Sequence, residues 1–346
     1  MYRAAKRVAF EVLFRSGAVH AFRCKHRGSV LVLIYHDVLP RGFPEQNPLF
    51  GMTVSTTEFE WQLRYVRKHY NPITFEEFKE WYFNKAPLPR NPVLITFDDG
   101  HRNNLDFALP ILQRHQIPAI CFVVAGFLGA KTLTWFEDAY YRLMFSASPS
   151  WRLNNGEVWP LNTVAQRAAA CGRFFSLCRT STQEQQSQEL ELLRSQLKVP
   201  ELNGHYPGRF EFLSTEQLRF LQENGVEIGA HTLTHPVLAT APAATSKAEI
   251  TEGKRRLEQI LGTSVRAFAY PFGAPRLDFT EREIEYVRQS GLMVGFAGEG
   301  GLVRRSDNPF SLPRVGIGRM TRAQFAATIT GTLDSIKKFA SRAALA

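Results

Sequence analysis

The sequence predicts an α/β protein whose strands form a parallel sheet, either closed into a barrel or doubly wound. Apolar, β-rich runs and helical segments alternate along most of its 346 residues. Residues 30–35 (Val-Leu-Val-Leu-Ile-Tyr) and 93–97 (Val-Leu-Ile-Thr-Phe) are apolar at nearly every position, which is typical of strands buried on both faces. Several of these runs end in polar residues, as strands do where they reach an active-site edge.

The composition is that of a soluble globular protein. Hydrophobic residues make up 44% of the chain and charged residues 21%. A chain of this length can hold one large α/β domain or two ordinary ones, and it can bury a large core. We therefore expect a folded protein and not a disordered one.

The expected elements fall into two series. In the first series these are a strand over 30–35, a helix over 57–69, a short helix capped by Thr74, a strand over 93–97, a helix over 103–115 and a strand over 118–124. In the second series these are helix 214–224, strand 226–229, helix 245–261, strand 266–270, helix 280–290, strand 292–297 and a last helix from about Thr321. The alternation predicts parallel strands joined by helices.

Residues 131–212 interrupt this alternation. They are expected to form several helices, and we interpret them as a cap inserted into the main domain. Trp135, at the start of the insertion, could stack on a sugar ring, although core packing is the more common fate of a tryptophan.

The N-terminal residues 1–28 form a basic arm. The chain has a net charge of +10, and the first thirty residues contribute seven Lys or Arg and one Glu, hence +6 of it. Arg3, Arg7, Glu11 and Arg15 recur every fourth residue and would share one helical face. Two interpretations stay open: a solvated arm, or peripheral contact with an anionic membrane surface. Nucleic acid is not an expected partner, since the rest of the chain is nearly neutral and has no nucleic-acid-binding motif.

No cleavable signal peptide is evident. Glu11 and Arg15 break the only candidate apolar stretch near the N-terminus. The four cysteines form no CxxC pair, which fits a reducing compartment. We therefore expect a cytoplasmic protein, with the inner membrane face as a possible site of peripheral attachment.

Three of the expected strands end in polar clusters. These are His36-Asp37, Asp98-Asp99 and the pair His231 and His235. In a barrel of parallel strands these ends meet on one face. Adjacent carboxylates repel one another unless a cation relieves them, and two histidines four residues apart can face one ion. The alternative for Asp98-Asp99 is an ordinary Asp-Gly turn, and the alternative for His231 and His235 is a pair of ordinary histidines. Both alternatives would have to be true at once for the chain to have no metal site here.

These segments resemble the polysaccharide deacetylases, which share the NodB homology domain. The resemblance lies in three motifs: residues 96–100 (Thr-Phe-Asp-Asp-Gly), 231–235 (His-Thr-Leu-Thr-His) and 270–273 (Tyr-Pro-Phe-Gly). The similarity extends over roughly residues 30–320 without the 131–212 insertion. Residues 34–38 (Ile-Tyr-His-Asp-Val) resemble the circularly permuted branch of poly-N-acetylglucosamine deacetylases.

The resemblance implies a distorted (β/α)7 TIM-like barrel over residues 29–335, with the core homology beginning near residue 92. It also implies one divalent metal ion, with zinc favoured over cobalt, nickel or manganese. Asp99, His231 and His235 would be its ligands. Asp98 would be the general base that takes a proton from the attacking water.

The third motif departs from the pattern of many members, in which it opens with an arginine that holds the base. Tyr270 stands at that position here. Arg314 is a candidate to orient Asp98 in its place, and the alternative is an ordinary surface arginine. Tyr270, Pro271 and Gly273 would then line the substrate site.

The general acid is expected at the front of the chain. Members usually carry a late histidine that protonates the leaving amine, but none of the nine histidines follows His235. In the permuted branch the acid-bearing strand comes first, so His36 would supply the proton. A buried histidine satisfied by backbone groups is the alternative. His101, which follows the first motif, would either line the substrate pocket or cap the next helix.

The expected function is the metal-dependent removal of an acetyl group from an N-acetylated sugar of a polysaccharide or glycolipid precursor. An O-acetyl esterase, a non-catalytic carbohydrate-binding barrel and a non-haem iron oxygenase with the same ligand set are the alternatives. The sugar itself and the oligomeric state are not indicated by the sequence.

Overall fold

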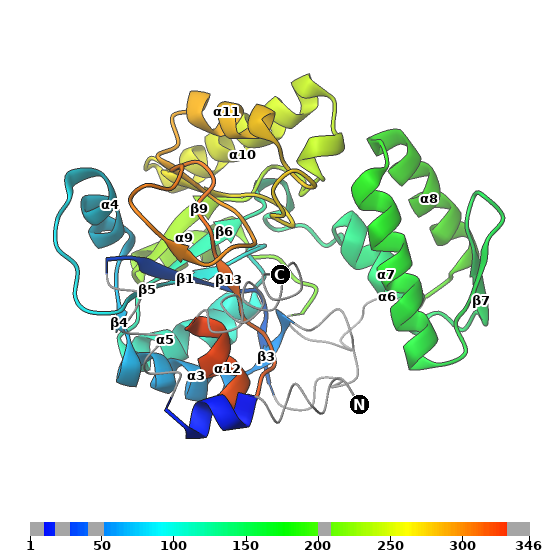
Figure 1. Ribbon diagram of the computed structural model, residues 1–346. Helices are drawn as coiled ribbons and strands as arrows, with labels where there is room; N and C mark the ends of the chain where they lie inside the picture. The colour runs from blue at the N-terminus through cyan, green and yellow to red at the C-terminus, as the bar shows by residue number, and fades with distance from the viewer. Residues whose placement is uncertain (1–9, 18–27, 41–51, 200–208, 331–346) are drawn as a thin grey trace, which may run out of the picture.

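The computed structural model describes residues 10–17, 28–40, 52–199 and 209–330. A curled sheet lies at its centre with helices packed outside it (Figure 1). A second lobe, formed by the segment that follows β6, stands to one side of this barrel. One hydrophobic cluster fills the space between sheet and helices, and another fills the space on the sheet's other face.

The main sheet of the described chain has nine strands, and seven of its parallel strands form the barrel wall. They are β1 (Val30–Tyr35), β5 (Pro92–Phe97), β6 (Ala119–Val123), β9 (Val226–Ala230), β10 (Ala267–Ala269), β11 (Val294–Phe296) and β13 (Val315–Gly316). The order is β11-β10-β9-β6-β5-β1, with β13 on the outer side of β1. Leu312, just before β13, bridges to Phe296 of β11, so this segment links the two ends of the sheet. The sheet is therefore a distorted barrel, not a doubly wound sheet.

Helices connect the strands as the alternation predicts. On the barrel they are α3 (Thr56–His69), α4 (Phe75–Asn84), α5 (Leu109–His115), α9 (Thr215–Glu223), α10 (Ala243–Leu261), α11 (Glu281–Gln289) and α12 (Arg322–Ile329), with short turns η3 (Ala125–Phe127) and η4 (Leu238–Thr240). Thr74 caps α4 in a capping box with Glu77, and Thr321 caps α12. Two short strands complete the main sheet: β4 (Asn71–Pro72) pairs with β5 in parallel, and β12 (Leu302–Val303) pairs with β1 in antiparallel orientation. The strands β2 (Val38–Leu39) and β3 (Val54–Ser55) form a separate two-stranded sheet.

The helix expected over 103–115 begins differently. Its first part, η2 (Asn104–Ala108), is a π-helix, and the regular α5 starts only at Leu109. The side chain of Asn104 donates to the backbone oxygen of His36 at 2.7 Å. A π-helical turn is wider than an α-helical one and is frequent at functional sites. Periodicity alone does not distinguish the two.

The described residues of the segment 131–212 form a lobe with its own hydrophobic cluster, and we call this lobe the cap. Its elements are α6 (Trp135–Phe145), α7 (Val164–Thr180), α8 (Gln183–Gln196) and a hairpin of β7 (Ser150–Arg152) and β8 (Val158–Pro160). Trp151 and Phe174 are fully buried in this cluster. The helices were expected from the sequence and the hairpin was not, because its strands are only three residues long.

Part of the basic arm packs onto the barrel. Residues 10–15 are helical, and Phe10 is buried against Ala323 and Ala327 of α12. Arg3 and Arg7 lie outside the described residues, so membrane contact by this arm stays a prediction. Within the described parts of the chain, we find no helix with the length and apolar character needed to cross a membrane.

Candidate active site

The polar strand ends meet at one cavity. It has a volume of about 360 Å³ and lies at the carboxyl ends of the parallel strands. His36 follows β1, Asp98 and Asp99 follow β5, and His231 follows β9, and all four line it. The strand order explains this meeting, since β1, β5, β6 and β9 are neighbours in the sheet.

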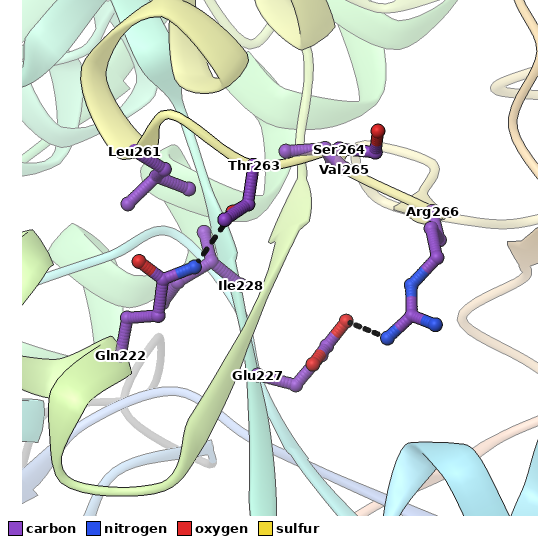
Figure 2. Close-up of a pocket in the computed structure, with 8 residues that line it drawn as sticks. All are labelled: Gln222, Glu227, Ile228, Leu261, Thr263, Ser264, Val265 and Arg266. Carbon is purple, nitrogen blue, oxygen red and sulfur yellow. Dashed lines mark hydrogen bonds and ion pairs between the residues drawn. The ribbon is translucent and has the colours of Figure 1, made fainter.

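A second cavity lies toward the other ends of the strands, between the start of β9 and the segment before β10 (Figure 2). Four of its polar side chains form two pairs. Gln222 donates to Thr263 at 2.8 Å, and Arg266 lies 3.1 Å from Glu227. The hydroxyl of Ser264 also lines this cavity, but the only titratable groups in the lining are the paired Glu227 and Arg266, so this cavity does not suggest chemistry.

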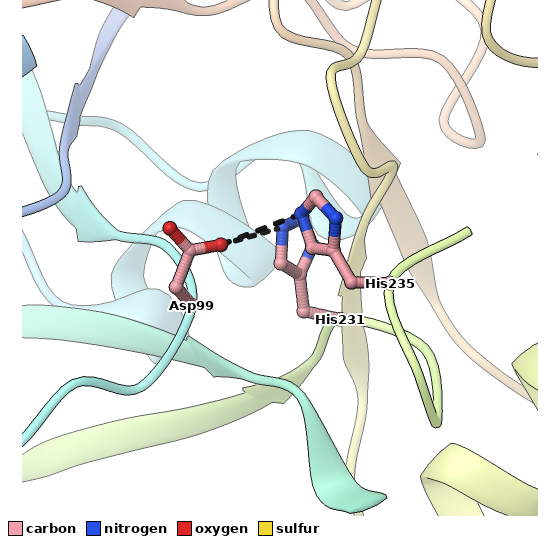
Figure 3. Close-up of side chains that lie close together, drawn as sticks. All are labelled: Asp99, His231 and His235. Atoms are coloured by element: carbon pink, nitrogen blue, oxygen red, sulfur yellow. Dashed lines mark ion pairs between the residues drawn. The ribbon is translucent and has the colours of Figure 1, made fainter. Parts of the chain in front are cut away.

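Asp99, His231 and His235 converge on one point (Figure 3). Asp99 Oδ1 lies 3.6 Å from His231 Nε2 and 3.4 Å from His235 Nε2. The three ligand atoms lie within 4.8 Å of one another, and all three residues are buried. One carboxylate and two imidazoles suit Zn²⁺ or another divalent first-row metal, and three protein ligands leave coordination positions open.

The His231 side chain is oriented for such a role. Its Nδ1 lies 2.7 Å from the backbone oxygen of Ala269 in β10. Donation of Nδ1–H to this oxygen leaves the Nε2 lone pair facing Asp99, which is how proteins commonly orient metal-binding histidines. Burial lowers the pKa of His231 to about 4, so the ring is neutral at ordinary pH. The residues present therefore fit a divalent metal.

Helix α10 holds the loop that carries both histidines. Glu249 accepts hydrogen bonds from the backbone N–H groups of Leu233 and Thr234 at 2.9 and 2.8 Å, and from the Thr234 hydroxyl. Gly253, one turn on, packs so closely that an added Cβ would lie 2.7 Å from the carbonyl carbon of Thr232. No sequence pattern pointed to Glu249, because it lies 14 residues beyond the motif on a separate helix, α10.

The loops of this site are strained. Asp99, Thr232, His235 and Phe272 all adopt positive φ, between 59° and 76°. Such a conformation costs a non-glycine residue on the order of 1–3 kcal/mol and persists only where its surroundings enforce it. Here the Thr232 hydroxyl accepts from the His235 N–H at 3.0 Å and closes the turn between the two histidines.

Arg314 holds Asp98. Its Nη1 and Nη2 donate to the two carboxylate oxygens of Asp98, both at 2.8 Å, and its Nε donates to the backbone oxygen of Ala297. Arg314 is 1% exposed, so it is not a surface arginine. Burial alone would raise the pKa of Asp98, but Arg314, His231 and His36 together lower it below its ordinary value.

Tyr270 lines the cavity without reaching Asp98. Its hydroxyl donates to the backbone oxygen of Phe310 at 2.8 Å, and its ring stacks on Phe279 at 3.8 Å. The two contacts turn the hydroxyl away from the carboxylate. Tyr270 therefore does not replace the arginine of the third motif, and Arg314, the residue just before β13, makes that contact.

His36 lies on the cavity wall beside the same carboxylates. It is partly exposed, and its charge would interact with both Asp98 and Asp99. It directly follows β1, and Tyr35 of β1 pairs in parallel with Phe97 of β5, so His36 and Asp98 follow adjacent strand ends. The structure thus places His36 and Asp98 on the wall of one cavity, and their roles as acid and base stay predictions.

His101 does not line the cavity, although lining the substrate pocket was one of the two roles expected for it. It is 1% exposed, with Nδ1 3.1 Å from Asp37 and Nε2 2.9 Å from Glu137. Arg209 contacts the same two carboxylates at 3.0 and 3.1 Å. Although burial opposes the charged form, Glu137 and Asp37 raise the pKa of His101 to about 10. The ring neither faces the cavity nor caps the next helix, because these two carboxylates hold it between barrel and cap.

Trp135, Pro271 and Gly273 also lie outside the cavity lining. Trp135 donates from Nε1 to the backbone oxygen of His235 at 3.1 Å, and its ring packs among cap aromatics and Phe272. Gly273 has φ +75°, and an added Cβ would lie 2.2 Å from the backbone nitrogen of Gly298. These residues are placed to support the loops, and sugar stacking by Trp135 does not follow from this geometry.

The sequence missed most of the cavity's aromatic wall. Phe136, Tyr140 and Phe175 come from the cap, and Phe272 comes from the third motif. Phe272 stands inside the segment 270–273 and could have been inferred from it. The three cap residues carry no local signal, because only the folding of the insertion over the barrel brings them to the site.

The comparisons with known proteins agree with this geometry. A family model described as polysaccharide deacetylase matches residues 85–295. The poly-beta-1,6-N-acetyl-D-glucosamine N-deacetylase of Staphylococcus aureus (strain MSSA476) is 23% identical over 297 residues, which cover 83% of this chain and 78% of that protein. The Escherichia coli (strain K12) protein of the same name is 34% identical over 70 residues, which cover 20% of this chain and 10% of that protein.

Solved structures show the same fold. IcaB from Ammonifex degensii superposes with a TM-score of 0.57 and 22% identity, covering 88% of this chain and 97% of that one. The Streptococcus pyogenes deacetylase PplD in complex with acetate has a TM-score of 0.57 and 17% identity, covering 87% and 98%. The distorted barrel expected from the motifs is therefore confirmed.

Proposed function

The chain belongs to the polysaccharide deacetylase family, and we propose that it is a metal-dependent hydrolase that removes the acetyl group from an N-acetylated sugar. One observation carries the proposal: a ligand triad, a carboxylate held by arginine and a histidine from the front strand all line one cavity. A sugar-binding barrel without activity would not need a base and an acid beside three convergent ligands.

Asp99, His231 and His235 would hold the divalent ion. When bound, such an ion supplies a Lewis acid that polarises the amide carbonyl and lowers the pKa of water. The triad leaves coordination positions open toward the cavity, as hydrolytic sites require. The metal itself is not identified by the donor set, since zinc, cobalt, nickel and manganese all accept these ligands.

Asp98 and His36 would handle the protons. Asp98 takes a proton from the water whose oxygen attacks the amide carbon. Arg314 keeps Asp98 ionised and fixed in orientation through its two hydrogen bonds. As the C–N bond breaks, His36 gives a proton to the leaving amine, so acetate and a free amino sugar are the products.

The acyl bond is proposed to be an amide because the named relatives are N-deacetylases. We also propose, from the basic arm, that the substrate is a polysaccharide or glycolipid precursor met at the inner membrane face. Finding the full chain in soluble fractions alone, or exported, would contradict that location without touching the chemistry.

Acetate release tests the proposal. Oligomers of β-1,6-linked N-acetylglucosamine, the sugar in the relatives' name, are compared with O-acetylated oligomers of the same length. We expect acetate and free amines from the first set, and Asp98→Asn should lower kcat by about 10²–10⁴-fold. Release from the O-acetylated set alone would establish an esterase, and no release from either would contradict hydrolysis.

A further inference from the structure

The cavity has two walls of different origin. The barrel supplies one wall, which carries the ligand triad, Asp98 and His36. The cap supplies the other wall, with six residues: Phe136, Glu137, Tyr140, Phe175, Arg179 and Arg209. Three of these cap residues are aromatic and three are charged.

The cap wall lies directly against the triad. The ring centroid of Phe136 is 4.8 Å from that of His235, and the ring of Phe272 is 4.9 Å from it on the barrel side. The indole of Trp135 bonds the backbone of His235. The centroids of these two rings are 5.8 Å apart, so both rings lie on the same side of His235 and limit the space on that side of the triad.

Buried ion pairs fix the cap in this position. Arg179 of α7 donates to both carboxylate oxygens of Asp278, at 2.7 and 2.5 Å, and Asp278 is fully buried. On the other side Glu137 contacts His101, and Arg209 contacts Asp37. The barrel partners of these contacts, Asp278, His101 and Asp37, lie in loops next to three motifs of the site, so the cap is tied directly to the loops of the site.

The same contacts neutralise the cations of the cavity. Arg179 faces Asp278, and Arg209 lies between Asp37 and Glu137. The third cavity arginine, Arg314, is bound to Asp98. Because each guanidinium has a carboxylate partner, the cavity favours an uncharged substrate over a polyanion.

We propose that this enzyme deacetylates a terminal N-acetylated sugar presented end-on to the cavity, and not the internal sugars of a long chain. The inference rests on the proposed N-deacetylase function and narrows its substrate. An internal sugar needs space on both sides of the triad for its neighbours, whereas Phe136 and Phe272 together occupy the side next to His235. The volume of about 360 Å³ lies at the lower end of the roughly 300–1,000 Å³ typical of small-molecule pockets.

Mapping the deacetylated position tests the proposal directly. A hexamer of β-1,6-linked N-acetylglucosamine is treated with the full-length, metal-loaded protein, and the position of each free amine is read by tandem mass spectrometry. Early products should carry the amine at one chain end. Amines at internal positions at comparable rates would overturn the inference and leave the deacetylase function intact, while absence of any amine would contradict that function itself.

A cap variant gives an independent test. Phe175→Ala removes an aromatic ring from the cap wall, and Val164→Ala, at an exposed position of the same helix, is the control. We expect Phe175→Ala to raise KM for a disaccharide several-fold with kcat nearly unchanged, as loss of uniform binding does. If the alanine variant does not fold, Phe175→Leu with its thermal midpoint replaces it. An unchanged KM in a folded variant would overturn the role of the cap.

Discussion

At the scale of single residues, the contact between Arg314 and Asp98 does two things. The two parallel hydrogen bonds fix the plane of the carboxylate, and the positive charge keeps it ionised in a buried place. A carboxylate held in this way is a weaker base, but it stays deprotonated, as a general base must be, at lower pH. The same residue thus sets both the geometry and the pH range of the proposed reaction.

Arg314→Met is expected to move the acid limb of the pH–rate profile upward. Without the guanidinium, burial raises the pKa of Asp98, so a larger part of the enzyme carries a protonated base at a given acidic pH. The profile of kcat/KM measures the shift. Arg304→Met, at an exposed arginine, is the matched control. An unshifted profile with lowered kcat would show that Arg314 acts through geometry alone.

His36→Gln is expected to act according to the leaving group. A sugar amine needs a proton to leave, whereas p-nitrophenolate leaves without one. Loss of a general acid should therefore cost about 10²-fold or more on the sugar amide and much less on p-nitrophenyl acetate. His115→Gln, on α5, serves as control. Equal losses on both substrates would contradict the acid role.

At the scale of elements, helix α10 positions the histidine loop. Glu249 bonds the backbone between the two histidines, and Gly253 allows the helix to approach Thr232. The loop itself is strained at Thr232 and His235. The helix therefore stabilises a loop conformation that the loop would not hold alone.

Gly253→Ala tests this support. The added methyl would lie 2.7–3.0 Å from backbone atoms of Thr232 and Leu233 and must displace the loop. Disturbing the support of metal ligands typically lowers metal affinity by about 10–100-fold, which calorimetric Zn²⁺ titration measures. Gly172→Ala, in α7 with open space around it, is the control and should stabilise the helix slightly. Equal zinc affinity in the two variants would show that α10 is not needed.

At the scale of the whole molecule, charges buried between cap and barrel join the two parts. His101 sits between Asp37 of the barrel and Glu137 of the cap. Its pKa is raised from 6.5 to about 10 when the protein is folded. The stabilisation is fully present below the unfolded value of 6.5 and is lost as pH rises toward about 10, because the folded state binds more protons in that window.

His101→Gln is therefore expected to flatten the alkaline side of the stability curve. In the wild type the free energy of unfolding should fall between pH 6.5 and 10 by more than it does in the variant. Urea denaturation of both proteins at several pH values measures the difference. Parallel curves would mean that His101 stays neutral in the folded protein.

The sequence predicted the site better than it predicted its surroundings. His36, Asp98, Asp99 and His231 follow strands directly, and strand ends in a barrel meet by geometry, so local patterns sufficed. Phe136 and Phe175 reach the site only because the insertion folds back over it, and no local pattern encodes that contact. His101 was misplaced in part for the same reason, since its partner Glu137 belongs to the cap.

The central claim is that Asp99, His231 and His235 hold the metal on which deacetylation depends. Metal content and acetate release are measured together on chelator-stripped protein, before and after Zn²⁺ is restored, for the wild type and for Asp99→Ala. The stripped wild type should be inactive, then bind one ion per chain and regain activity, while Asp99→Ala should recover neither. Full activity of the stripped wild type, or tight binding and full recovery by Asp99→Ala, would contradict the claim.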